Sequence, residues 1–194
     1  MSLTDPMTDR LTSELEPVLS MPDPRTKLSA YHDLPYALFR YDPEDELELR
    51  KQVALLETRL SQKGKRVTRI SLAECLDEAM RSQRPLEEWF AAEREQGVDS
   101  IVETVHAVLS QDVPLVDLAA SRLPADPDPL RDIVFFTRAG TLFPVYRCHT
   151  LLEQLHGRLL VPAVLFYPGT LDGVVGLKYM GVVDADASYR PKIF

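Results

Sequence analysis

The 194-residue sequence contains little of what several protein classes require. Its two cysteines, Cys75 and Cys148, are too few for a disulfide framework or a four-thiolate zinc site. No run of about 18 apolar residues occurs that would cross a membrane as a helix. Residues 1–10 alternate polar and acidic side chains, unlike the apolar stretch of a signal peptide. We therefore expect a cytoplasmic protein with no membrane partner and with buried, unreactive thiols.

Positive charge is also scarce, because 22 Lys and Arg residues face 30 Asp and Glu residues, for a net charge of −8. This balance disfavours a general affinity for DNA or RNA, since Lys and Arg contacts to phosphates supply most non-specific binding. One basic cluster stands out, and it comprises Arg59, Lys63, Lys65, Arg66 and Arg69. Such a cluster is typical of a solvated helix end, and no aromatic platform accompanies it. A nucleic-acid-binding module that uses this cluster remains a weaker alternative.

Motifs for phosphate, dinucleotide and metal binding are missing as well. The pair Gly64-Lys65 leads into Arg66 and not into the hydroxyl residue that a P-loop needs. Three later glycines have the wrong spacing for a dinucleotide fingerprint and favour turns, namely Gly169, Gly173 and Gly176. His149 and His156 lie two turns apart on one predicted helix, too far to share a metal ion. We assign no catalytic residue, metal ligand or cofactor, and we expect a protein that is not an enzyme.

Strand and helix patterns alternate in the first half of the sequence. An apolar strand at 37–41 is followed by a helix to about Lys63, whose apolar face comprises Leu49, Val53, Leu56 and Leu60. A second strand at 67–70 and a helix at 72–81 come next. The order predicts a parallel pair of strands joined by a right-handed crossover.

The second half contains the most apolar segments. Residues 132–136 and 163–166 predict two central strands that are buried on both faces of a sheet. A last strand is expected at 177–180. Further helices are expected at 85–96, 100–109, 115–123 and 142–157.

These segments predict an α/β fold in three layers, with a mainly parallel sheet of about five strands. Residues 34–194 are expected to form a single α/β domain, into which residues 82–123 are inserted as a helical block. Residues 1–33 are expected to form a peripheral helical segment ahead of it.

The carboxyl ends of parallel strands are the expected place for a ligand or partner, because open parallel sheets bind there. The residues at these ends are Tyr41, Asp42, Thr137, Arg138, Tyr167, Gly169 and Thr170. Tyr and Arg side chains are also favoured at protein interfaces, which adds Arg147, Tyr189 and Arg190 as interface candidates. A degenerate nucleotide- or anion-binding domain that uses Thr137, Arg138 and Gly169-Thr170 is therefore an alternative function.

Three stretches together resemble a known family. They are Leu34-Pro35-Tyr36-Ala37-Leu38-Phe39-Arg40-Tyr41-Asp42-Pro43-Glu44, then Val161-Pro162-Ala163-Val164-Leu165-Phe166-Tyr167-Pro168-Gly169 with Asp172-Gly173, and the ending Tyr189-Arg190-Pro191-Lys192-Ile193-Phe194. In this order they resemble the BrxB family of the bacteriophage-exclusion (BREX) defence systems.

This resemblance implies a non-catalytic core component, an adaptor or scaffold, of a multiprotein antiphage assembly. The expected partner is the alkaline-phosphatase-like PglZ-type protein, within a set of BREX components that includes a DNA methyltransferase and an ATPase. The resemblance transfers no catalytic residue onto this sequence, and a homodimer is compatible with it.

Overall fold

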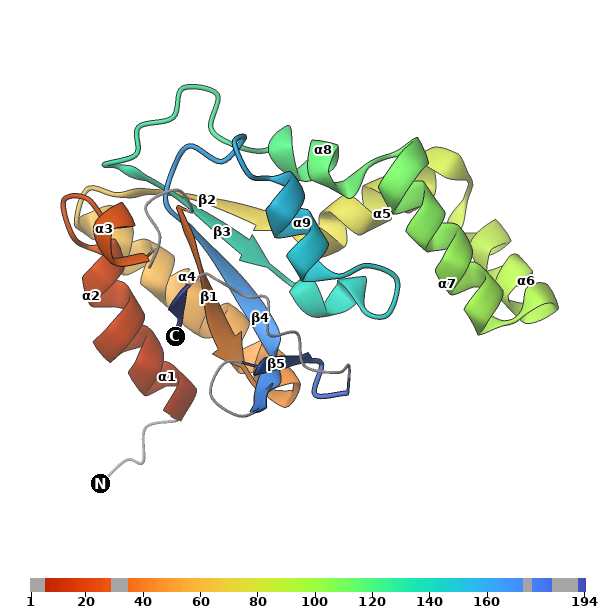
Figure 1. Ribbon diagram of the computed structural model, residues 1–194, viewed down its shortest axis with the longest axis horizontal. Helices are drawn as coiled ribbons and strands as arrows, with labels where there is room; N and C mark the ends of the chain where they lie inside the picture. Colours follow the sequence, from red (N-terminus) through yellow and green to blue (C-terminus); the bar gives the residue numbers. More distant parts are fainter. Residues whose placement is uncertain (1–5, 29–34, 173–175, 183–191) are drawn as a thin grey trace.

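A mainly parallel, six-stranded sheet forms the centre of the fold (Figure 1). The computed structural model describes residues 6–28, 35–172, 176–182 and 192–194. The strand order is β2-β3-β4-β1-β6, and β5 pairs with the far end of β4. The strands are β1 (Tyr36–Tyr41), β2 (Arg66–Ser71), β3 (Asp132–Thr137), β4 (Ala163–Asp172), β5 (Gly176–Tyr179) and β6 (Lys192–Ile193).

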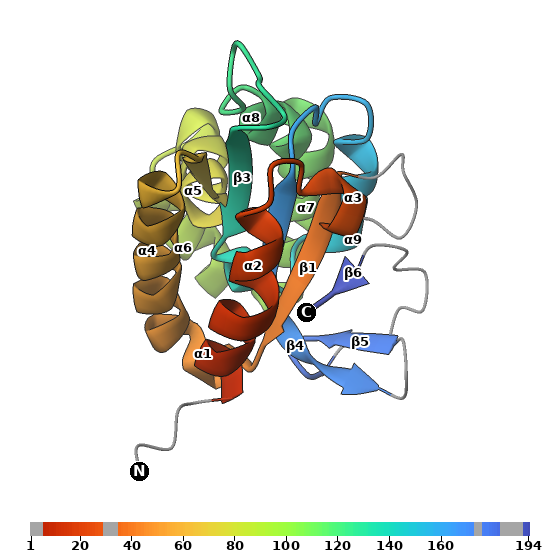
Figure 2. The same ribbon diagram turned by 90° about the vertical axis from the view of Figure 1, so that its left-hand side faces the viewer.

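Helices cover both faces of the sheet, as Figure 2 shows from the side of the amino-terminal helices. One face carries α1 (Pro6–Arg10), η1 (Leu11–Leu15), α2 (Glu16–Leu19), α3 (Arg25–Leu28), η2 (Pro43–Asp45) and α4 (Glu46–Gln62). The other face carries a second group of helices, which are α5 (Leu72–Gln83), α6 (Leu86–Gln96), α7 (Val98–Ala107), η3 (Val108–Asp112), α8 (Leu115–Ala120), η4 (Ala139–Leu142) and α9 (Cys148–Gln154). This arrangement confirms the predicted three-layer α/β class.

The two central strands follow from their apolar sequences. All six residues of β3 are buried, and successive side chains alternate between the two faces. Ile133 and Phe135 join the core under α4, whereas Val134 and Phe136 join the core on the α5 side. The prediction that 132–136 and 163–166 are central strands is confirmed.

The expected pairing of the first two strands is wrong. β1 lies beside β4, with Tyr36 opposite Ala163, whereas β2 lies beside β3, with Arg66 opposite Asp132. The two strands are parallel members of one sheet, but β3 and β4 separate them. The apolar β3 and β4 need cover on both faces, while β2 has exposed side chains that suit a sheet edge.

Two segment boundaries also differ from the sequence prediction. Helix α9 begins at Cys148 and not at Leu142, because Phe143 is extended before Pro144, a backbone restriction that proline imposes on its predecessor. Strand β4 continues to Asp172 and pairs antiparallel with β5, so Gly169 does not lie in a loop.

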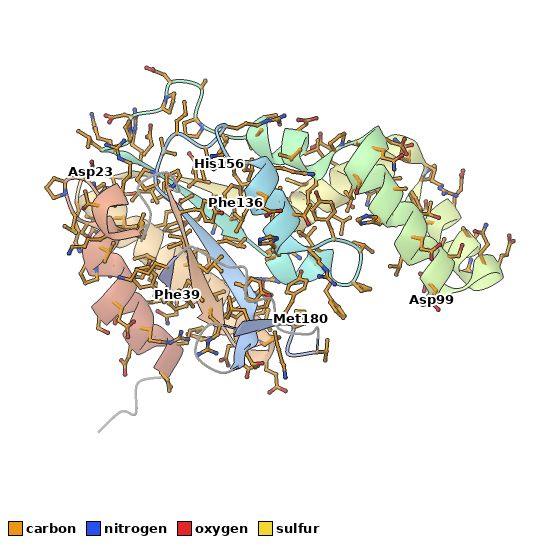
Figure 3. The ribbon with its side chains drawn as sticks, in the orientation of Figure 1. Asp23, Phe39, Asp99, Phe136, His156 and Met180 are labelled. Carbon is orange, nitrogen blue, oxygen red and sulfur yellow. The ribbon has the colours of Figure 1, made fainter. Side chains whose placement is uncertain are left out.

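The expected helical block contains an arm that extends away from the sheet (Figure 1). We call α6 and α7, residues 86–107, the projecting hairpin. Trp89 anchors it, since the ring is 2% exposed and its Nε1 donates to the Met80 carbonyl at 3.1 Å. The Arg84 guanidinium lies 3.9 Å from the centre of that ring. Asp99 lies at the far end of the hairpin, well away from Phe39 and Phe136 in the sheet (Figure 3).

The amino-terminal helices pack closely on the sheet and on α4. Their buried side chains belong to the same core as Phe39 and Leu56, and they are Met7, Leu11, Leu15, Leu19 and Leu28. Among the described residues, no helix has both the length and the apolar character needed to span a membrane.

Candidate functional site at the strand ends

The carboxyl ends of β1, β2 and β3 meet the first turns of α4, and two neighbouring pockets open there. The Tyr41 pocket, about 180 Å³, is lined by Tyr41, Pro43, Glu46, Arg50, Arg138, Gly140, Thr141, Pro168 and Met180. The Ser71 pocket, about 260 Å³, is lined by Glu46, Leu49, Arg50, Val53, Arg69, Ser71, Glu74, Thr137 and Arg138. We call the two together the strand-end crevice. Its location matches the place where parallel sheets bind ligands.

Arg138 is shared by both pockets and has an unusual conformation. Its backbone is left-handed, with φ 59° and ψ 35°, a conformation that few residues other than glycine adopt. Its carbonyl oxygen accepts a hydrogen bond from the Thr141 hydroxyl at 2.8 Å. Its Nε is buried and has no hydrogen-bond partner within the described part of the chain. A buried donor without a partner is rare in folded proteins.

Tyr41 and Arg50 both hydrogen-bond to Glu46. The Tyr41 hydroxyl donates to the Glu46 carboxylate, and Arg50 Nε donates to the same group at 2.8 Å. Burial raises the pKa of Tyr41, and the adjacent Glu46 carboxylate raises it further. Tyr41 therefore remains a protonated donor that holds Glu46 at the boundary between the two pockets.

The structure brings only some of the predicted site residues together. Tyr41, Thr137 and Arg138 line the strand-end crevice. Asp42 instead accepts the Glu44 backbone N–H at 3.1 Å and caps η2. Tyr167 is 1% exposed and packs against Tyr179 in the core on the α5 side.

The other predicted site residues lie elsewhere. Gly169 and Thr170 pair with Tyr179 and Lys178 in the β4–β5 hairpin, beyond the parallel part of the sheet. Arg147 is the exposed residue immediately before α9 and does not line either pocket of the crevice. The predicted interface residues Tyr189 and Arg190 lie outside the described residues.

Sequence reasoning missed Arg50, Arg69 and Met180 as lining residues. Arg69 is near the end of the predicted strand at 67–70, and Arg50 is near the start of the helix that follows β1. Both positions could have been inferred, because the strand ends and the following helix starts lie at the same edge of a parallel sheet. Met180 follows β5, a strand whose pairing with β4 was not predicted.

The basic cluster does not form one free patch. Arg59 and Lys63 both pair with Glu16, at 2.7 and 2.8 Å. Lys65 is 7% exposed, and its Nζ donates to backbone carbonyls, including that of Leu130 at 2.7 Å. Of the two remaining cations, Arg66 pairs with Asp132, whereas Arg69 lies 3.9 Å from Glu57 and lines the Ser71 pocket.

The two thiols are buried, as predicted. Burial raises the pKa of Cys148 to about 12 and also raises the pKa of Cys75. Each cysteine is therefore a protonated, apolar packing group at neutral pH. Within the described ranges, no group of three or more His, Cys, Asp or Glu side chains is placed to hold a metal ion.

Comparisons with known proteins agree on one family. The family described as BREX protein BrxB matches residues 68–193, which include most of the sheet, the projecting hairpin and Arg138. A BREX protein BrxB from Bacillus cereus (strain H3081.97) is 29% identical over 164 residues, and the alignment covers 82% of each chain. No solved structure matches the chain. These matches confirm the resemblance carried by the three sequence stretches: the chain belongs to the BrxB family and is a component of a BREX phage-defence system.

Proposed function

We propose that this protein is a non-catalytic adaptor of its BREX system and that it docks a PglZ-type, alkaline-phosphatase-like protein through the projecting hairpin. The observation that supports this proposal best is the exposed ring of Phe90 on an acidic arm that extends from the sheet. Membership of the BrxB family supplies the setting, and the family resemblance supplies the partner class.

The projecting hairpin has a strongly one-sided charge. Arg94 is the single Lys or Arg residue of the hairpin. Six exposed residues carry carboxylates, and they are Glu87, Glu88, Glu93, Glu95, Asp99 and Glu103. This surface is complementary to a basic surface on a partner. Such complementarity steers association and selects the partner more than it adds affinity.

Two apolar side chains on the hairpin are exposed amid these charges. Phe90 is 54% exposed on α6, and Val98 is 58% exposed at the start of α7. Aromatic side chains that fill a pocket on a partner commonly contribute most of the binding energy at an interface. The neighbouring Trp89 is buried and holds α6 in place, so Phe90 is presented on an ordered element.

The test is a binding measurement between the full chain and the PglZ-type protein of the same BREX system. We expect an affinity in the micromolar range or tighter. Phe90→Ala should weaken binding at least tenfold, equivalent to about 1.4 kcal/mol. Reversing the charges of Glu87 and Glu88 to lysine should lower the association rate and its dependence on salt.

Leu130→Ala is the matched control, because Leu130 is an apolar residue that is 50% exposed far from the hairpin. We expect it to bind as the unaltered protein does, and both variants should unfold at the same denaturant concentration. The docking proposal is wrong if the two proteins do not associate, or if Phe90→Ala binds as tightly as Leu130→Ala.

The non-catalytic part of the proposal has a separate test. In cells that lack this protein, restored phage resistance should increase with its amount until it matches the amount of the PglZ-type protein. A catalyst would instead restore full resistance at a small fraction of that amount, and this result would contradict an adaptor role.

A further inference from the structure

We propose that the Ser71 pocket of the strand-end crevice binds a phosphate group, either as inorganic phosphate or as the phosphate of a mononucleotide. This site lies apart from the projecting hairpin, and it does not depend on the docking proposal. It also differs from the predicted anion site, because Arg50, Arg69 and Ser71 replace Gly169 and Thr170.

The first argument is the unmet hydrogen-bonding capacity of Arg138. Arg138 lines the pocket, and its buried Nε has no acceptor within the described residues. Its left-handed backbone, at φ 59°, holds the residue in a conformation that is unfavourable for a side chain with a Cβ. A guanidinium donor held in this way suits the oxygens of a phosphate, with which arginine forms paired, charge-assisted hydrogen bonds.

The second argument is the set of groups that face the same space. Arg69 and Arg50 bring two more guanidinium groups to the pocket. Arg50 Nε donates to Glu46, and an Arg69 guanidinium nitrogen lies 3.9 Å from a Glu57 carboxylate oxygen, so the other N–H groups of these two arginines are the donors available to a ligand. Ser71 and Thr137 lie opposite each other at the ends of β2 and β3. The Thr137 hydroxyl donates to the Ile70 carbonyl at 3.4 Å, so of the two hydroxyls that of Ser71 is the donor available to a ligand. The Ser71 oxygen accepts the Glu74 backbone N–H at 3.3 Å, which leaves its own proton to be donated.

The third argument is the charge balance of the pocket. Glu46 and Glu74 are the acidic lining residues, against three arginines. Glu46 already accepts hydrogen bonds from Tyr41 and from Arg50. The lining residues therefore carry three positive and two negative charges, and Glu57 pairs with Arg69 from outside the lining. Arg138 is the lining arginine with no ion pair among the described residues, within a protein whose net charge is −8. The pocket also lies at the amino-terminal end of α5, a 12-residue helix whose dipole favours an anion.

The size of the pocket sets the class of ligand. A space of about 260 Å³ lies just below the usual range for complete small-molecule sites. It accommodates a phosphate with its hydration, whereas a nucleoside attached to that phosphate would extend out toward the Tyr41 pocket or the solvent.

The experiment is calorimetric titration and thermal unfolding of the full chain with inorganic phosphate, AMP and sodium chloride at matched ionic strength. We expect saturable phosphate binding and a rise in unfolding temperature that chloride does not produce. Tighter binding of AMP than of phosphate identifies a nucleotide as the ligand, and equal binding identifies phosphate itself. A response to phosphate no larger than the response to chloride overturns the proposal.

Two variants locate the site. Arg138→Gln should raise the phosphate dissociation constant at least tenfold. The matched control is Arg131→Gln, because Arg131 is exposed and lies just before the opposite end of β3. It makes the same change in charge and should leave the phosphate dissociation constant unaltered. If Arg138→Gln does not fold, Arg69→Gln replaces a side chain that is 49% exposed and should still weaken binding severalfold. Phosphate binding that neither variant weakens contradicts the assignment to this pocket.

Discussion

At Gly169 the backbone of β4 passes very close to its neighbours. A Cβ added there would lie 2.3 Å from the Lys178 carbonyl oxygen and 2.8 Å from Cε1 of Tyr167. We expect Gly169→Ala to lower the free energy of unfolding by about 1–3 kcal/mol, because the strand pairing and the ring would have to move. Chemical denaturation measures this loss.

Gly140→Ala is the control for this prediction. The nearest atom to its added Cβ is the Sδ of the flexible Met180 side chain, at 3.3 Å. We expect a much smaller change in stability than for Gly169→Ala. Equal effects at both positions would mean that the close approach of β4 and β5 does not limit the residue at 169.

Glu16 makes part of the stability depend on pH. Burial raises the pKa of Glu16, but hydrogen bonds from Lys63 and Arg59 outweigh it, so the folded-state pKa lies below its usual value. A lowered carboxyl pKa contributes stability above the unfolded-state pKa, and that contribution is lost as pH falls through the folded-state pKa. We expect Glu16→Gln to lower the unfolding free energy by about 1 kcal/mol at neutral pH, with the difference shrinking below about pH 4.

Denaturation of both proteins across this pH range provides the measurement. Glu48→Gln is a suitable comparison, because its ion pair with Lys51 is exposed to solvent and should matter little. A difference between Glu16→Gln and the unaltered protein that stays constant down to pH 3 would show that the ionised carboxylate contributes nothing.

At the scale of elements, the amino-terminal helices illustrate how packing stabilises short segments. Leu15 ends η1 and is fully buried against the α4 core. We expect Leu15→Ala to lower the unfolding free energy by about 2–5 kcal/mol, through lost burial and the cavity it leaves. Leu47→Ala, on the exposed side of α4 at 69% exposure, should change it little. Comparable losses would contradict a core position for η1.

Local patterns in the sequence were sufficient to predict α4 and β3, because the apolar spacing of α4 matches the face it buries and the continuous apolar run of β3 matches a strand buried on both faces. The neighbours of β1 were not predictable in this way, since strand pairing depends on which strands need cover on both faces. The amino-terminal segment showed helical spacing, but its place in the core under Phe39 came only from the structure.

The residues of the candidate site also divide into those that the sequence indicated and those that depend on how the elements pack. Thr137 and Arg138 were found because a strand end is visible in the sequence as the end of an apolar run. Arg50 and Arg69 were missed because they reach the crevice through the way α4 and β2 pack around it. Tyr167, also predicted from its place near a strand end, packs in the core, since successive strand residues alternate between the two faces of the sheet.

At the scale of the whole molecule, stability should differ between the sheet and the projecting hairpin. β3 and β4 are central and covered on both faces, whereas α6 packs mainly against α7. We expect amide hydrogen exchange to be slowest in β3 and β4 and clearly faster in α6 and the far end of α7. Exchange followed by mass spectrometry tests this order. Equal protection in the hairpin and the central strands would show that they unfold as one unit.

Helix α5 connects two parts of the protein that otherwise share little. It starts at the Ser71 cap beside the Ser71 pocket and ends at Gln83, next to Arg84 and the base of the hairpin. Its 12 residues make a rigid rod about 18 Å long. One continuous helix therefore runs from the Ser71 pocket to the base of the hairpin, so a substitution that displaces the first turn of α5 should also displace the hairpin.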